Sequence, residues 1–180
     1  MSESNAASRD QVWSLVDRLL SSMVESIRQI DALAPGFPDE LYEARDPESN
    51  MQVVDFIERL ARHSLQHRHE VASVRASVGR SWPTDPGDSH PDTGAPYAST
   101  WYAWFLLEAL LRRAELAGEL IGLEDEDLDR QPAEQHVAGN NRTIRQVCEH
   151  VLHVEQWLLN GARTGIETHR AEDVTDTGRE

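Results

Sequence analysis

The sequence predicts an all-α protein, a four-helix bundle that occupies residues 1–163 and is followed by a polar tail over 164–180. In four stretches apolar residues recur every three or four positions, which is the spacing of one helix face. No stretch sustains the alternation of apolar and polar residues that marks a half-buried strand. With 180 residues the chain is also long enough to bury one core without disulfides or other covalent supports.

The first two helices are expected over residues 9–33 and 50–78. The apolar stripe of the first consists of Val12, Val16, Leu19, Met23, Ile27 and Ile30. The seam of the second consists of Val53, Ile57, Leu60, Ser64, His67, Val71 and Val74. Pro35 and Gly36 end the first stretch and Gly79 ends the second, because proline and glycine interrupt helices.

The third and fourth helices are expected over residues 98–122 and 142–160. The apolar positions of the third are Trp104, Leu107, Leu110, Leu111, Ala114, Ala117 and Ile121, and those of the fourth are Ile144, Val147, Val151, Val154 and Leu158. Gly161 is the expected C-cap residue of the fourth helix, since glycine readily adopts the left-handed conformation found there. Residues 164–180 lack apolar periodicity and are expected to be disordered.

The connection from Gly79 to Ala98 is rich in Pro, Gly, Asp and Ser and is long for a compact domain. It divides the chain into two halves, each with a pair of predicted helices. We expect this segment to lie over one end of the bundle as a mobile cover. The alternative is a loose tether between the halves.

Charge and cysteine content exclude several classes of protein. Acidic residues number 32 against 17 basic ones, and the net charge of -15 repels nucleic acids and anionic membranes. The single cysteine, Cys148, cannot form an internal disulfide, and no apolar run is long enough for a transmembrane segment. The sequence therefore predicts a cytoplasmic protein whose partner is a small molecule, and it leaves a homodimer open.

Histidines supply the candidate site. His67 falls near the centre of the apolar seam of the second helix, while His63, one turn before it, falls on the border. His150 lies at the border of the seam of the fourth helix. Two imidazoles at i and i+4 can bind one metal ion, and a third from a facing helix completes a set that leaves positions open for water or substrate. The alternative is a group of hydrogen-bonded core histidines without a metal.

Residues near these histidines allow several interpretations. Glu70 is a fourth ligand, an acceptor for an imidazole N–H, or a solvated charge at the border of the seam. His69 and His153 are expected on the surface, with His153 as an alternative to His150 or a support for it. Cys148 is expected to be a buried, inert thiol. The tryptophans that we expect in the core, where they can also wall a pocket, are Trp101, Trp104 and Trp157.

Three segments of the chain resemble the DinB/YfiT-like family. Residues 123–130 form an acidic linker that leads into 142–157, a helix with a Thr-Ile-Arg start and a histidine that matches the family's single metal ligand. Residues 60–70 resemble the other family element, a helix with paired ligands four residues apart. The resemblance implies a metal triad of His63, His67 and His150. The pair here precedes the single histidine, and a permuted order or an exchange of the two halves of a pseudo-symmetric bundle would preserve the site in space.

The resemblance also implies a function. Family members include thiol-dependent transferases and isomerases, and related bundles form the iron-binding part of sulfoxide synthases. We therefore expect an enzyme that uses a divalent ion (Zn, Ni or Fe) for thiol transfer or hydrolysis on a small molecule, with a low-molecular-weight thiol as a candidate substrate. The alternatives are a non-catalytic metal-binding or oligomeric stress protein and a metal-free helical interaction module. The sequence names no catalytic residue.

Overall fold

The computed structural model describes residues 9–33, 38–80, 101–131 and 141–177, and no β-strand occurs in these ranges. Its elements in chain order are the helices α2 (Asp10–Leu33), α3 (Pro38–Glu43), α4 (Val53–Ser77) and α5 (Trp101–Gly118), the 3-10 helix η2 (Asp125–Asp129) and helix α6 (Ile144–Thr177). The prediction of an all-α protein is confirmed. The short helix α3 was not predicted, since six residues are too few to show a helical period.

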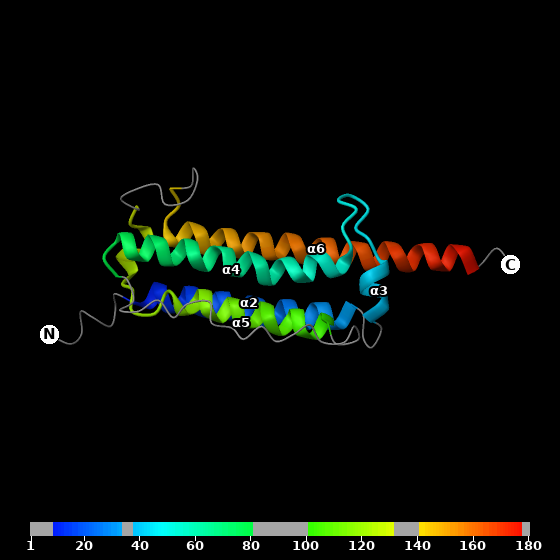
Figure 1. The fold of residues 1–180 in the computed structure, drawn as a ribbon, viewed down its shortest axis with the longest axis horizontal. Helices are drawn as coiled ribbons and strands as arrows, with labels where there is room; N and C mark the ends of the chain where they lie inside the picture. Colours follow the sequence, from blue (N-terminus) through cyan, green and yellow to red (C-terminus); the bar gives the residue numbers. More distant parts are fainter. Residues whose placement is uncertain (1–8, 34–37, 81–100, 132–140, 178–180) are drawn as a thin grey trace.

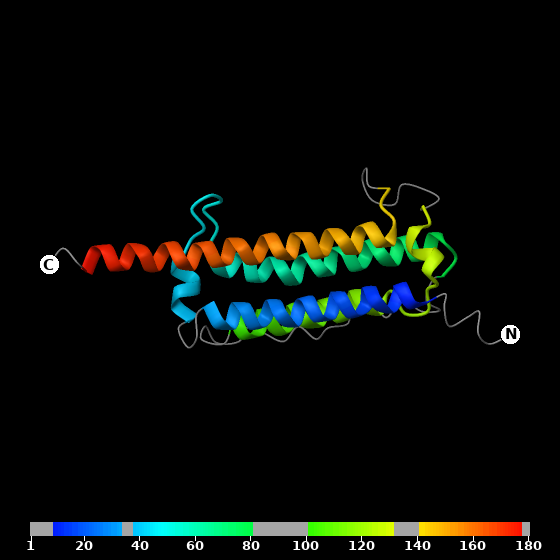
Figure 2. The same ribbon diagram turned by 180° about the vertical axis from the view of Figure 1, so that it is seen from behind.

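The long helices α2, α4, α5 and α6 lie side by side in both views (Figures 1 and 2). Helix α4 contacts α5 and α6, and α2 contacts the same two helices from the other side. Helices α4 and α5 run in the same direction, opposite to α2 and α6 (Figure 1). Contacts agree with this, because Arg113 of α5 meets Ser64 of α4, while Arg75 farther along α4 donates to the carbonyls of Glu119 and Ile121 just beyond α5.

The parallel course of α4 and α5 places Arg80 and Trp101 at opposite ends of α5. The predicted cover from Gly79 to Ala98 falls mostly on residues 81–100, which lie outside the described part of the chain, so it stays a prediction.

The core has two apolar clusters with a polar layer between them. One cluster includes Met23, Phe56, Leu60, Leu158 and Ile166, and the other includes Leu19, Val71, Leu116, Val147 and Val151. Each of the four long helices contributes to both clusters. The buried residues Ser64, His67, Arg113 and Glu155 lie between the two clusters along their helices. The candidate site belongs to this polar layer.

The predicted end of the fourth helix is wrong. Helix α6 continues through Gly161 to Thr177, so residues 164–177 are helical rather than disordered. Ala162 and Ile166 are each only 1 % exposed, and their burial ties this part of the helix to the apolar cluster around Phe56. Gly161 is not a cap: a Cβ there would lie 2.5 Å from the Phe56 ring, so its lack of a side chain allows close helix packing.

The other boundaries need smaller corrections. Helix α5 ends at Gly118, before the predicted residue 122, and Gly122 adopts a φ of 83° in the turn that follows. Trp157 is half exposed, with its ring edge against Phe56, so the prediction of a core position is wrong for this residue. The side chains of Trp101 and Trp104 lie outside the described part. None of the described helices combines the length and apolarity needed to cross a membrane.

Candidate metal centre

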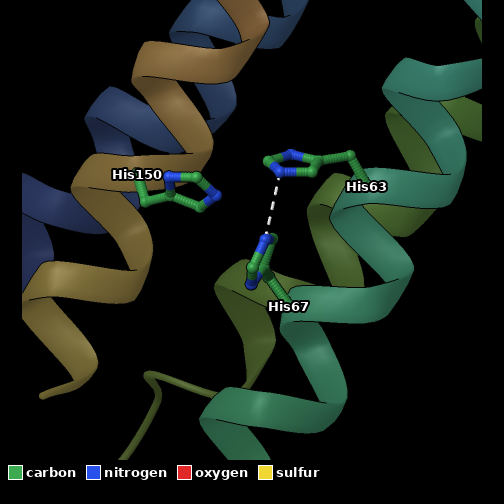
Figure 3. Close-up of side chains that lie close together, drawn as sticks. All are labelled: His63, His67 and His150. Atoms are coloured by element: carbon green, nitrogen blue, oxygen red, sulfur yellow. Dashed lines mark hydrogen bonds between the residues drawn. The ribbon is translucent and has the colours of Figure 1, made fainter. Parts of the chain in front are cut away.

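Three histidine side chains converge between α4 and α6. His63 and His67 come from consecutive turns of α4, and His150 faces them from α6 (Figure 3). One ring nitrogen from each lies within 4.8 Å of the others, and the ring centroids are 4.4, 5.0 and 5.3 Å apart. The structure thus brings together the three residues that the sequence singled out.

The helical repeat explains this placement. Residues four apart project from the same helix face, and that face of α4 carries the fully buried Ser64 and Val71. His67 is 2 % exposed, whereas His63 and His150 are partly buried at the edge of the seam. The cluster therefore has a closed side at His67 and an accessible side at the other two rings.

Glu70 fixes the orientation of His67. Its Oε2 lies 2.7 Å from Nδ1 of His67, and only 6 % of the residue is exposed. The ring donates its Nδ1 proton to this carboxylate, which leaves the lone pair of Nε2 directed at the other two imidazoles. Of the three interpretations of Glu70, the structure shows the acceptor for an imidazole N–H, and burial rules out the solvated charge.

Arg142 is the site residue that the sequence analysis missed. Its Nε donates to Oε1 of Glu70 at 3.0 Å and its Nη2 donates to Oε2 at 2.8 Å. This residue precedes α6, so it has no place in a helical period. Reciprocal bonds between Thr143 and Gln146, 2.9 and 3.3 Å long, fix the start of α6 beside it. The only sequence signal for Arg142 was its position before a capped helix.

Electrostatics keep the three imidazoles neutral. Burial, the neighbouring imidazoles of His67 and His150, and the charges of Arg113 and Arg142 lower the pKa of His63 to about 3. Burial also lowers the pKa of His67, against the opposing effect of the Glu70 carboxylate. Burial and then Arg142 lower the pKa of His150. At neutral pH all three rings therefore offer a lone pair, which is the form that coordinates a metal.

The contact between His63 and His67 determines which ring nitrogen of each histidine carries the proton before a metal ion binds. Their Nε2 atoms are 3.0 Å apart, and Nε2 of His67 is the acceptor because its proton sits on Nδ1. In the ion-free protein His63 therefore donates from its Nε2. Coordination through that atom requires the His63 proton to move to Nδ1, whereas His67 is already in the tautomer that a ligand needs.

The remaining residues that the sequence singled out lie outside the cluster. His69 and His153 are exposed, as expected, and His153 does not take the place of His150. Cys148 is fully buried, also as expected, and burial raises the pKa of its thiol to about 12. Because an active thiol nucleophile needs a low pKa, Cys148 is inert.

Three neutral imidazoles suit a divalent transition-metal ion and leave coordination positions open for another ligand. The buried carboxylate behind His67 completes the arrangement found around metal-binding histidines. Comparisons with protein-family models, curated proteins and solved structures found no match. The function is therefore inferred from the geometry of the site.

Proposed function

We propose that this chain binds one divalent metal ion between α4 and α6 and uses it in a reaction on a small molecule. His63, His67 and His150 are the ligands. The observation that carries the proposal is the chain of contacts from Arg142 through Glu70 to His67, which holds the Nε2 lone pair of His67 toward two further imidazoles.

The geometry favours a metal site over a hydrogen-bonded core. A core histidine needs one partner for each ring nitrogen, and His67 would be satisfied by Glu70 and a single second contact. Here two further rings converge on the same point, and the pKa of each imidazole is lowered. Three neutral imidazoles are a ligand set that a divalent transition-metal ion takes.

Three protein ligands and an accessible edge favour catalysis over a purely structural ion. A bound divalent ion supplies a Lewis acid that lowers the pKa of a thiol or of water. The chain itself holds the ligands, and the Arg142–Glu70 pair fixes the orientation of the most buried one. We propose thiol transfer or hydrolysis on a small substrate, a DinB/YfiT-like four-helix bundle as the fold, and Zn, Ni or Fe as the ion.

A second candidate is a structural metal. The ligands come from α4 and α6, two long helices in extensive contact, so an ion here would also link them. An ion that only links helices has no exchangeable ligand position, whereas a catalytic ion binds an added small molecule. The cytoplasmic location predicted from the sequence stays a prediction.

The test of the proposal is elemental analysis of the full chain purified without an affinity tag. We expect about one equivalent of a single transition metal per chain, removable by a chelator. Protein that contains no such ion, and takes none up when Zn, Ni or Fe(II) is added, would contradict the proposal.

A further inference from the structure

A second polar cluster lies in the same layer of the core. Arg113 of α5 and Glu155 of α6 form an ion pair with 2.7 Å between Nη1 and Oε2, and each is 1 % exposed. Nε of Arg113 donates to the hydroxyl of Ser64 on α4 at 3.3 Å. Ser26 of α2 donates to Oε1 of Glu155. This cluster therefore joins all four long helices.

The pair lies close to the histidines. Ser64, which accepts from Arg113, directly follows His63 along α4, and both residues lie on the stretch of α4 between the two apolar clusters. The charge of Arg113 is one of the influences that lower the pKa of His63. Arg113 is thus a fixed buried cation near the proposed metal ligands, and Glu155 is its anionic partner.

Stability alone does not account for such a pair. Replacing a buried ion pair by apolar residues of similar volume is often neutral or stabilising, because removing two charges from water is costly. A buried charge does have a large effect on nearby charges. Where water does not screen it, a unit charge within about 10 Å of a dication changes the binding of that ion by at least tenfold.

We propose that the Arg113–Glu155 pair sets the affinity of the histidine site for its ion. Arg113 repels a cation at the histidines, and Glu155 cancels that repulsion. Glu155 and Arg113 are positioning residues in this scheme, since neither is among the ligands. This inference rests on the proposed function, because it requires that the histidines bind a metal.

Whether a variant binds the metal ion more tightly or more weakly distinguishes this electrostatic role from a structural one. Glu155→Gln keeps the shape and the contacts with Ser26 but leaves Arg113 uncompensated, so binding should weaken by at least tenfold. Arg113→Met removes the repelling cation, so binding should become several-fold tighter. The double replacement Arg113→Met with Glu155→Met should bind within about threefold of the unmodified chain. A merely structural role would weaken binding in both single variants, because each leaves one buried charge unpaired.

Glu149→Gln is the matched control. Glu149 lies on the same helix, beside His150 in the sequence, and pairs with Arg18 at 2.7 and 2.9 Å. Its side chain is 45 % exposed, so water screens the charge and the affinity should stay within about twofold.

The measurement is competition for Zn²⁺ between the full-length variants and a chromophoric chelator, with the thermal midpoint of each ion-free variant recorded beside it. Unchanged affinity in Glu155→Gln, or unchanged or weaker binding in Arg113→Met, would overturn the inference. If Glu155→Gln does not fold, Arg113→Met decides alone: tighter binding supports the inference, and unchanged or weaker binding overturns it. An unmodified chain that binds no ion would overturn the proposed function as well, so the two failures are distinguishable.

Discussion

Glu70 accepts hydrogen bonds from both His67 and Arg142 through the same oxygen, Oε2, at 2.7 and 2.8 Å. Arg142 holds the second oxygen as well, at 3.0 Å. The carboxylate therefore cannot rotate without breaking a bidentate contact, and the His67 ring is fixed by Glu70 of α4 together with Arg142 from the segment just before α6. This arrangement gives the first prediction.

Glu70→Gln should weaken the binding of Zn²⁺ by about 10- to 100-fold, because such an outer partner fixes the ring and raises the basicity of the ligand. Isothermal titration calorimetry, in which Zn²⁺ is added to the ion-free variant, measures this change in affinity. Glu58→Gln is the control, since Glu58 lies on the same helix and pairs with Arg62 one turn later, away from the histidine cluster. Equal affinity in Glu70→Gln and the unmodified chain would show that the carboxylate plays no part in metal binding.

The second prediction concerns Cys148. Its thiol is fully buried with a pKa raised to about 12, so at pH 8 it is protonated and inaccessible. In the folded protein it should not react with Ellman's reagent over an hour, and it should react at once in denaturant. Rapid reaction of the folded protein would show that this part of α6 opens.

The third prediction tests the packing of α6 on α4. Gly161→Ala should destabilise the protein by about 1–3 kcal/mol, because the added methyl would overlap the Phe56 ring. Gly118→Ala is the matched control: nothing lies within 4 Å of a Cβ there, so the replacement should be neutral or stabilising by up to about 1 kcal/mol. Urea unfolding of both variants gives the comparison, and a stable Gly161→Ala would contradict the close approach.

Much of the fold was predictable from the sequence because apolar spacing is a local signal. It placed the four long helices and put His63, His67 and His150 on inward-facing sides. The extension of α6 was not predictable, since residues 164–177 are mostly polar and the burial of Ile166 depends on distant partners. Gly161 looked like a helix end for the same reason: sequence does not distinguish a cap from a close helix contact.

The surroundings of the site were predictable only in part. Glu70 had three interpretations because its role depends on which groups face it from other helices. Arg142 and the buried Arg113–Glu155 pair gave no periodic signal, and a charged residue inside a helical stretch is usually at the surface. Only tertiary packing shows that these charges lie beside the histidines.

The fourth prediction concerns chemistry at the site. An ion with three neutral ligands keeps its full charge, so it should bind an added thiol as thiolate at neutral pH. A low-molecular-weight thiol such as 2-mercaptoethanol should change the visible spectrum of the cobalt-substituted protein, more strongly as the pH rises toward the pKa of the free thiol. The change should vanish in His150→Ala. A spectrum indifferent to millimolar thiol in cobalt-loaded protein would contradict thiol transfer and favour hydrolysis or a structural ion.

The measurement that tests the central claim most directly is the stoichiometry of metal binding in two histidine variants of α4. His67 is 2 % exposed and lies in the cluster, whereas His69, two residues later, is exposed and outside it. We predict that the unmodified chain and His69→Ala each bind one equivalent of Zn²⁺ and that His67→Ala loses at least a hundredfold in affinity. Equal binding by His67→Ala and His69→Ala, or none by the unmodified chain, would contradict the account.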